Sequence, residues 1–378
     1  MATTSELRKA ARVTMASAAS HQADGAAAVG ELAERLGDQA DLYAVFVAPG
    51  YDLDVVGRRL RHHFGDRVIG CTSSGNVGAH GYDRNGICAV ALTGGGITTR
   101  TVVVNPLSDP VAAVENAGAR LAAVRAELGD RDKFAILLAD GLTGSEDELA
   151  ATLMAMLGDV PIIGGSAGDG LQFRRTAVYH DGVFGDDRAT VTLVAAEAPF
   201  RLLRLQHHLA TDTVLVATDV DPGERIVRTL NGQTAVEAYA EAVGVGRDQM
   251  TPVVFSQHPL LLAAGGASWV RSIAEVRDDG ALRMFARVDL GDVLRLGRST
   301  GMVERLQEGI AEVRDDLGSL SGMLVFDCIL RRLESEEHGL SERVGQVLAA
   351  CGAAGFSTYG EQFNGMHMNQ TLVAVAFG

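Results

Sequence analysis

The sequence has 378 residues, which predicts two domains at about 100–200 residues per domain. Apolar residues make up 47% of the chain and aromatic residues only 5%, so the cores must be built mainly from Ala, Val, Leu and Ile. The net charge of −15 argues against nucleic acids and anionic membrane surfaces as partners, because like charges repel.

The cysteines lie far apart and form neither a C-x-x-C motif nor a zinc-ligand spacing; they are Cys71, Cys88, Cys328 and Cys351. The N-terminal residues show no export signal, and no apolar run reaches the roughly 18 residues that a membrane span needs. We therefore expect a cytoplasmic protein with reduced thiols.

The first half of the chain alternates between helical and strand patterns. Its first ~20 residues are typical of a short helix or a loose arm. Helices are predicted at 26–36, 54–64, 110–128 and 146–157. Strands are predicted at 41–49, 67–75, 86–93, 97–104, 134–140 and 160–168, followed by a hairpin at 177–196. Ser145 and Glu148 fit a capping box before the helix at 146–157.

The second half repeats this alternation. Helices are predicted at 234–244, 301–316 and 341–351, and strands at 323–330 and 370–377. The segment 219–231 contains Asp, Pro and Gly and is the best candidate for a domain junction. We therefore predict an N-terminal arm or helix at 1–28 and domains at 29–222 and 223–378. The fold class is α/β (α+β), with mixed sheets covered by helices in two domains that face each other across a cleft.

Three glycine loops resemble one another and each follows an apolar strand; they span 69–76, 163–169 and 354–361. Glycine lets the backbone approach a ligand closely, and the small hydroxyl residues offer hydrogen bonds. We expect the three loops to line a common cleft, the alternative being that each is only a tight crossover at a sheet end.

The segment 164–168 fits the G-x-S-x-G elbow of serine hydrolases, with Ser166 as the nucleophile. A strand precedes it, as the motif requires, but the residues that follow indicate a loop instead of a helix. Asp327 and His367 stand in the right chain order for a triad, although a chain of this length offers many such combinations. Hydrolysis is therefore the third hypothesis.

Some histidines lie in or beside apolar segments, namely His207, His208, His258 and His367. Neutral imidazole is a common metal ligand and suits haem iron. The alternative for each is a hydrogen-bonded core residue. Surface positions are expected for the others, which are His21, His62, His63, His80, His180 and His338. The acidic run of Glu334, Glu336 and Glu337 is interpreted as an exposed helix end.

Several motifs resemble the FIST family of sensory modules, which has an N-terminal and a C-terminal FIST domain. They are IGCTSSG at 69–75, Gly81-Tyr82, IIGGSAGDG at 162–170 and GFSTYGEQFNGMHMNQT at 355–371. Within the family the chain is most similar to the NosP group of haem-binding nitric oxide sensors. That similarity comes from 164–170, from Gln206-His207 followed by 211–212, from FDCILRRLE at 326–334 and from 355–365.

The resemblance implies a haem b cofactor, nitric oxide as the signal, and no enzymatic activity. It also implies a partner such as a histidine kinase, a diguanylate cyclase or a phosphodiesterase, in two-component or biofilm signalling. Self-association is left open. For the axial metal ligand we rank His207 first, then His258, then His367, with Cys328 a weaker candidate. Arg271 or Arg204 would pair with the haem propionates, the alternative for either being a surface arginine. The second hypothesis is a FIST sensor of a small organic metabolite such as an amino acid.

Overall fold

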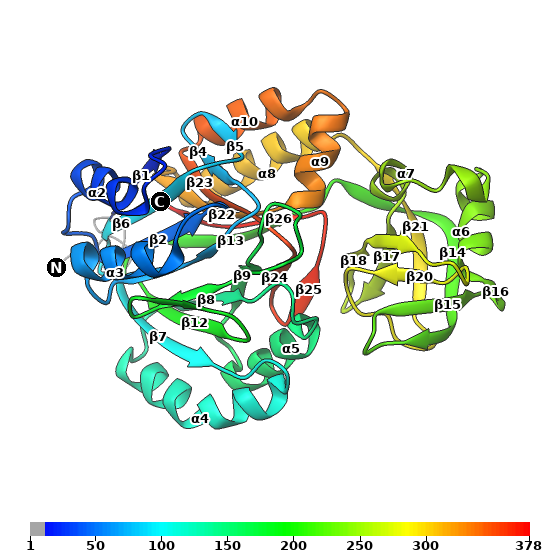
Figure 1. Ribbon diagram of the computed structural model, residues 1–378, viewed down its shortest axis with the longest axis horizontal. Helices are drawn as coiled ribbons and strands as arrows, with labels where there is room; N and C mark the ends of the chain where they lie inside the picture. The colour runs from blue at the N-terminus through cyan, green and yellow to red at the C-terminus, as the bar shows by residue number, and fades with distance from the viewer. Residues whose placement is uncertain (1–11) are drawn as a thin grey trace.

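The computed structural model describes residues 12–378. Figure 1 shows a large main body and a smaller β domain that stands apart from it, joined by the start of β14 and the end of β21. The expected fold class, α/β with mixed sheets in two domains, is confirmed. In the described part of the chain, no helix combines the length and apolar character needed to cross a membrane.

The main body contains three repeats of the same order of elements. The first repeat consists of β1 (Val13–Ser20), α2 (Gly25–Leu36), β2 (Leu42–Val47), α3 (Leu53–Phe64), β3 (Val68–Thr72), β4 (Asn76–Gly78), β5 (Gly81–Asp83) and β6 (Ile87–Gly94). The second consists of β7 (Thr98–Val104), α4 (Pro110–Glu127), β8 (Lys133–Ala139), α5 (Glu146–Leu157), β9 (Ile162–Ser166), β10 (Val178–His180), β11 (Val183–Gly185) and β12 (Ala189–Ala195).

The third repeat is interrupted by the small domain and has two helices between its second and third strands, where the other repeats have one. It consists of β13 (Phe200–Leu205), α8 (Met302–Leu317), β22 (Gly322–Cys328), α9 (Ile329–Glu337), α10 (Ser341–Ala350), β23 (Ala353–Thr358), β24 (Glu361–Phe363), β25 (Met366–Met368) and β26 (Leu372–Phe377). The predicted arm at 1–28 is corrected for its described part, because β1 pairs antiparallel with β6 along its whole length and α2 begins at Gly25. Residues 1–11 of that arm lie outside the described residues.

Each repeat forms four strands of one sheet, and its remaining hairpin pairs with the sheet of another repeat. The first sheet has the order β1-β6-β2-β3-β10-β11, the second β7-β12-β8-β9-β24-β25, and the third β13-β26-β22-β23-β4-β5. The second and third strands of each repeat pair in parallel, and the other pairs are antiparallel. The exchange of hairpins ties the three repeats together in a ring.

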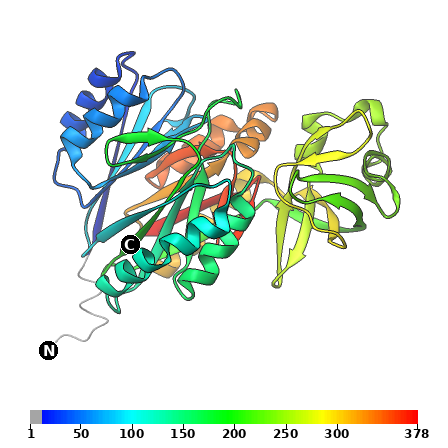
Figure 2. The same cartoon turned by 60° about the horizontal axis from the view of Figure 1, so that its bottom comes forward.

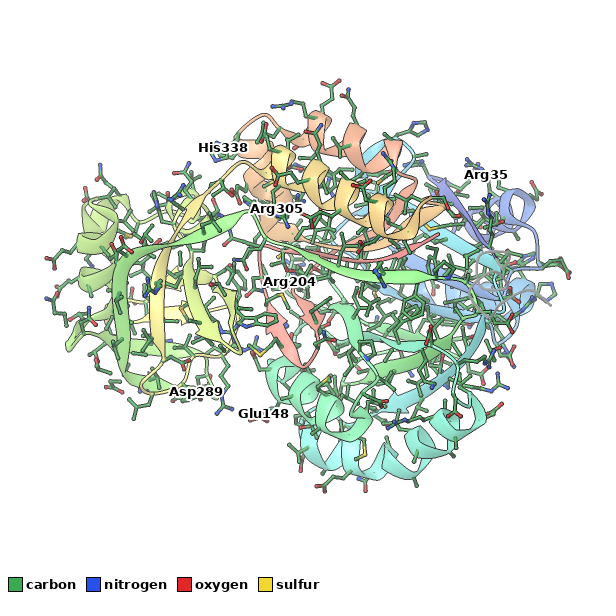
Figure 3. All side chains as sticks on the ribbon, turned by 180° about the vertical axis from the view of Figure 1, so that it is seen from behind. Arg35, Glu148, Arg204, Asp289, Arg305 and His338 are labelled. Carbon is green, nitrogen blue, oxygen red and sulfur yellow. The ribbon has the colours of Figure 1, made fainter. Side chains whose placement is uncertain are left out.

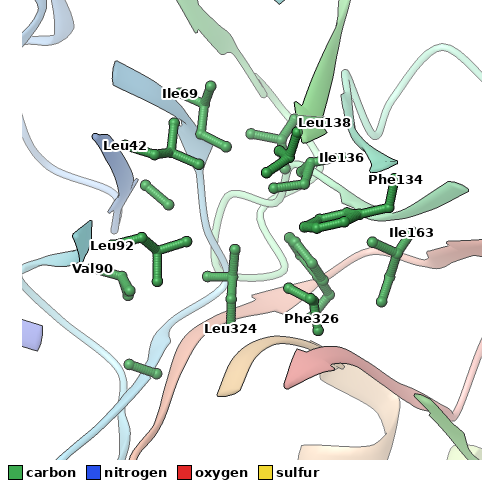
Figure 4. Packing of buried hydrophobic residues seen from close by; sticks show 14 of the residues in the cluster. Leu42, Ile69, Val90, Leu92, Phe134, Ile136, Leu138, Ile163, Leu324 and Phe326 are labelled. Atoms are coloured by element: carbon green, nitrogen blue, oxygen red, sulfur yellow. The ribbon is translucent and has the colours of Figure 1, made fainter. Parts of the chain in front are cut away.

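The three sheets face one another around a central apolar core, and Figure 4 shows the side chains that meet there. Strands β2, β8 and β22 are buried on nearly every residue, which explains their continuous apolar runs. Helix pairs cover the outer faces, α2 and α3 on the first sheet and α4 and α5 on the second (Figure 2). Helices α8 and α10 cover the third sheet.

A glycine at the same place in each repeat lets the second and third strands approach closely. An added Cβ at Gly70, Gly164 or Gly355 would lie 2.2, 1.8 or 1.8 Å from the carbonyl oxygen of Val45, Leu137 or Val325, respectively. These backbone atoms have no room to move within a paired sheet. The three glycines therefore belong to the packing of the sheets.

The small β domain has its own core under α6. It consists of β14 (His208–Asp221), β15 (Ile226–Leu230), β16 (Gln233–Thr234), α6 (Ala235–Val243), the 3-10 turn η1 (Arg247–Gln249), α7 (Pro252–Gln257), β17 (Leu260–Ala264), β18 (Ala267–Arg271), β19 (Ile273–Val276), β20 (Leu282–Met284) and β21 (Val293–Ser299). The predicted boundary between 222 and 223 falls in the turn between β14 and β15, so the spatial division of the chain differs from the expected one.

Candidate functional site

The three glycine loops meet in the middle of the main body. Backbone hydrogen bonds join each loop to another, from Ser74 to Ser357, from Gly168 to Thr72 and from Ser166 to Gly360. Most of their side chains are buried, because the loops pack against one another. The prediction that they come together is confirmed, but they do not line one common cleft: Ser74 is the one loop residue that lines a nearby pocket of about 360 Å³.

Ser166 does not form a hydrolase triad with its predicted partners. The Ser166 hydroxyl is fully buried and accepts a hydrogen bond from Gln362, whose amide also lies 3.1 Å from Nδ1 of His367. Asp327 lies elsewhere and binds Arg331 at 3.1 Å and the Tyr82 hydroxyl. No helix follows the motif at once, as expected. The residues of the third hypothesis are therefore not assembled.

Glu361 is a fully buried carboxyl beside these loops, bonded by Thr358 and by the Thr371 hydroxyl at 2.6 Å. Burial raises its pKa from 4.5 to about 8. The folded state thus holds a proton that the unfolded state has lost, and stability falls as pH rises through this window. Between about pH 6.5 and 8 we expect the contribution of Glu361 to the free energy of unfolding to fall by about 1.5 kcal/mol.

Urea denaturation at several pH values checks this expectation. Glu361→Gln keeps the shape but has no proton to lose, so its stability should not fall over the same pH range. Unfolded histidines are half protonated at about pH 6.5, so His207 and His208 raise the stability of both proteins slightly as pH increases, and the difference between the two profiles isolates Glu361. Parallel pH profiles for the two proteins would show that Glu361 is ionised in the folded state.

A pocket of about 310 Å³ lies between the main body and the small β domain, and we call it the Arg271 pocket. The main body contributes α5 and the β24–β25 hairpin, and the small domain contributes β17, β18 and the segment before β21. Its polar lining residues are Asp147, Glu148, Arg271, Arg287, Asp289, Asp292 and His367. Figure 3 shows Glu148 and Asp289 on the two sides of this junction. The pocket lies between the main body and the inserted small domain, and none of the three glycine loops lines it, so it differs from the cleft expected between residues 29–222 and 223–378.

Arg271 is the most unusual residue of this pocket. Its side chain is only 4% exposed, and Nη1 donates to the carbonyl oxygens of His367 at 3.0 Å and Val270 at 3.3 Å. Its Nε has no partner, and no carboxylate in residues 12–378 forms an ion pair with it. Burial lowers its pKa, and Asp147 partly offsets that shift. Asp292 and Asp289 act on it in the same direction as Asp147, but a buried guanidinium without a directly bound carboxylate is still costly.

The other charges of the Arg271 pocket are mostly paired. Arg287 binds Glu148 at 3.0 Å and Asp289 at 2.8 Å, and Asp147 binds Arg225 at 2.9 Å. Asp292 accepts the backbone N–H of Asp289 and forms no ion pair within the described residues. One positive and one negative group, Arg271 and Asp292, are therefore available on the walls of the same pocket.

The helix that carries Glu146, Asp147 and Glu148 was predicted to begin with a capping box. The helix begins where expected, but Ser145 makes no side-chain cap bond, so the capping box is wrong. The reason is that Glu148 turns outward to Arg287. Glu146 and Asp147 both bind Arg225 of the small domain, at 2.6 and 2.9 Å. The start of α5 therefore holds the two domains together.

A second polar group lies where the chain crosses between the domains. His207 Nε2 is 2.9 Å from Oε1 of Glu334, and His208 Nε2 is 3.7 Å from the same oxygen. All three side chains are buried, which corrects the expectation that Glu334 lies on an exposed helix end. Burial lowers the pKa of each histidine to about 3, so both rings are neutral at physiological pH.

The structure separates the predicted site residues into two places. His207 lies with Glu334, and His258 lines an adjacent pocket of about 410 Å³ that also contains Arg298 and His338. His367 and Arg271 lie at the Arg271 pocket. Arg204 is at neither place, because it stacks on Trp269 at 4.4 Å. Cys328 is buried in β22, and that burial raises the pKa of its thiol.

Comparison with known proteins decides the family. The model of the FIST N domain matches residues 41–233, and the model of the FIST C domain matches residues 235–364. The chain belongs to the FIST family. FIST domains are sensory, ligand-binding modules, which agrees with the expectation that this FIST protein is not an enzyme.

Other comparisons add little. No curated protein sequence matches the chain. Among solved structures, one similar to this FIST protein is the crystal structure of cyanuric acid hydrolase from A. caulinodans. The two are 10% identical, the match covers 96% of this chain and 99% of the other, and the TM-score is 0.38. A likeness at this level carries no argument about function.

Proposed function

We propose that this FIST protein senses a small zwitterionic metabolite of the amino-acid class, which binds in the Arg271 pocket. The observation that carries the proposal is the buried guanidinium of Arg271, which lines the pocket without a carboxylate partner. A ligand carboxylate would supply the missing counter-charge through charge-assisted hydrogen bonds. The ligand's ammonium group would then face Asp292, whose carboxylate forms no ion pair within the described residues.

Binding in this pocket would act on the relation between the two domains. Asp147 and His367 belong to the main body, whereas Arg271 and Asp292 belong to the small domain. A ligand that contacts both sides stabilises the arrangement in which both sides reach it. We propose that a partner signalling protein, such as a histidine kinase or a cyclic-di-GMP enzyme, recognises that arrangement. A cytoplasmic location remains a prediction.

Thermal unfolding in the presence of each of the twenty standard amino acids tests the proposal. We expect at least one to raise the Tm of the wild type, and Arg271→Met to weaken its binding by about 100-fold in calorimetry. The free variant should be at least as stable as the wild type, because it no longer buries an unpaired charge. A residue with only a structural role would show the opposite, a loss of stability.

Arg283→Met is the matched control, because Arg283 lies in the same domain but is exposed and pairs with Glu275 at 2.9 Å. This variant should bind as the wild type does. If no amino acid shifts the Tm, or if both variants bind equally well, the Arg271 pocket is not an amino-acid site.

Haem-based nitric oxide sensing is the second candidate function. The observation that favours it is the His258 pocket, which offers two imidazoles, His258 and His338, and the guanidinium of Arg298 for a propionate. Bound haem would supply an iron atom that binds nitric oxide. The largely polar residues that line this pocket, and the bond from His207 to Glu334, rank haem below the amino-acid ligand. An absorption spectrum after addition of hemin decides: a Soret band lost in His258→Ala supports haem, and no band excludes it.

A further inference from the structure

Three buried side chains at the crossing between the domains have the geometry of metal ligands. One ligand atom from each of His207, His208 and Glu334 lies within 4.8 Å of the other two. The two imidazole Nε2 atoms are 2.9 and 3.7 Å from Oε1 of Glu334. Two ligands of a tetrahedral zinc ion stand about 3.3 Å apart, so these distances need only small side-chain movements to accept an ion.

The hydrogen bonds of the two histidines are incomplete. His207 and His208 are 2% and 1% exposed, and the Nδ1 atom of each has no hydrogen-bond partner. Each Nδ1 is the ring nitrogen that does not face Glu334, so Nε2 is the ligand atom and Nδ1 is left for an outer contact.

We propose that His207, His208 and Glu334 bind a divalent transition-metal ion of the Zn²⁺ or Fe²⁺ class. Two imidazoles and one carboxylate are a common donor set for these ions. A single carboxylate is too few oxygen ligands for Ca²⁺ or Mg²⁺, and the absence of a thiolate argues against Cu⁺. Glu334 also lines the His258 pocket, which leaves a fourth position that water or His338 can fill.

The surroundings of the site support a bound cation. The guanidinium of Arg331, on the same helix as Glu334, is 3.1 Å from Asp327 and is balanced by that carboxylate. The second oxygen of Glu334 accepts a hydrogen bond from Gln370 at 3.4 Å. The His207 carbonyl accepts from the backbone and the hydroxyl of Thr300, both at 2.8 Å. Such outer contacts orient ligands before the ion arrives.

The position of this site links metal occupancy to the two domains. His207 and His208 begin the segment that enters the small domain, Thr300 lies on the segment that returns, and Glu334 belongs to α9 of the main body. His208 Nε2 now bonds the carbonyl of Ser256 in α7 at 3.0 Å. Metal binding would replace this hydrogen bond with a bond from Nε2 to the ion, and the ion would join the crossing segment to α9. Metal occupancy would thus be a second input, separate from the ligand of the Arg271 pocket.

Titration of the metal-stripped protein with Co²⁺ tests the proposal, because tetrahedral Co²⁺ absorbs visible light. We expect one equivalent to bind with visible bands, and Zn²⁺ to displace it. Binding should weaken by about 100-fold or more in His208→Ala and in Glu334→Gln, since loss of an outer-contact residue alone weakens metal binding about 10- to 100-fold. Zn²⁺ should also raise the Tm of the wild type but not that of the variants.

His62→Ala is the matched control, because His62 is exposed on α3 far from the crossing. Circular dichroism confirms that each variant folds, and Glu334→Gln preserves the shape of the side chain. Arg271→Met should bind Co²⁺ as the wild type does, so this test is independent of the amino-acid proposal. Equal Co²⁺ binding in the wild type, the ligand variants and the control, or no visible bands at all, would overturn the metal site. So would a Soret band after hemin addition that depends on His207.

Discussion

Gly164→Ala is expected to destabilise the protein by about 3 kcal/mol or more, or to prevent folding. The added Cβ would lie 1.8 Å from the carbonyl oxygen of Leu137, and 2.7 and 2.9 Å from two other backbone atoms of that residue. Gly164 and Leu137 are register partners in the parallel pair β8–β9, so neither strand can move away without losing its hydrogen bonds. Urea denaturation followed by circular dichroism measures the effect.

Gly30→Ala is the control, and we expect it to change the stability in the opposite direction. Gly30 lies inside α2, and an added Cβ there would meet nothing within 4 Å. Alanine is the better helix former, so this variant should be more stable by about 0.5–1 kcal/mol. If Gly164→Ala unfolds at the same urea concentration as the wild type, strands β8 and β9 do not approach each other as closely as described.

Arg225→Met is expected to loosen the small β domain from the main body. The Arg225 guanidinium binds Glu146 at 2.6 Å and Asp147 at 2.9 Å across the junction, and it donates to the Phe285 carbonyl at 2.8 Å. The variant leaves Glu146, which is 2% exposed, buried without its counter-charge. Removing one partner of a buried ion pair costs about 3–5 kcal/mol. Small-angle scattering should show a larger radius of gyration.

Arg228→Met controls for the loss of an arginine in the same hairpin. Arg228 pairs with Asp219 and Asp221, each at 3.3 Å, but it is 44% exposed. An exposed pair contributes about 0–1 kcal/mol, so this variant should keep the wild-type scattering curve and stability. Equal curves for all three proteins would mean that Arg225 does not hold the domains together.

Regular elements could be predicted well from local patterns. The helix expected at 146–157 spans Glu146–Leu157, and that expected at 341–351 spans Ser341–Ala350. Hydrophobic periodicity and turn residues are local signals, and these elements depend on them. The similarity of the three glycine loops reflects the repeats of the main body, because each loop lies at the end of the third strand of a repeat.

The arrangement of those elements could not be predicted in the same way. The chain leaves the third repeat after β13 and returns at α8, and the strands of the intervening domain look like any others. Nor does the sequence show that β4–β5, β10–β11 and β24–β25 each join the sheet of another repeat. Both features depend on contacts between residues far apart in the chain, for which a single sequence offers no local signal.

The candidate site was predicted in part. His207 and His367 were singled out because they stand in or beside apolar segments, and Arg271 because it would pair with a haem propionate; each is buried. Glu334 was missed because neighbouring acidic residues made it look solvated. Only the fold shows that the first turns of α9 pack beneath the crossing segment. No local sequence pattern singled out Arg225 or Asp292. Arg225 binds carboxylates of the other domain, and Asp292 accepts a hydrogen bond within a turn.

Hydrogen exchange of the protein, with and without an equimolar mixture of the twenty amino acids, tests the central claim that the cleft between the domains is the ligand site. We predict slower exchange in peptides that cover the start of α5, strand β18 and the β24–β25 hairpin, because these segments border the Arg271 pocket. The same peptides of Arg271→Met should show no change. Protection confined to other segments, or none anywhere in the wild type, would contradict the account.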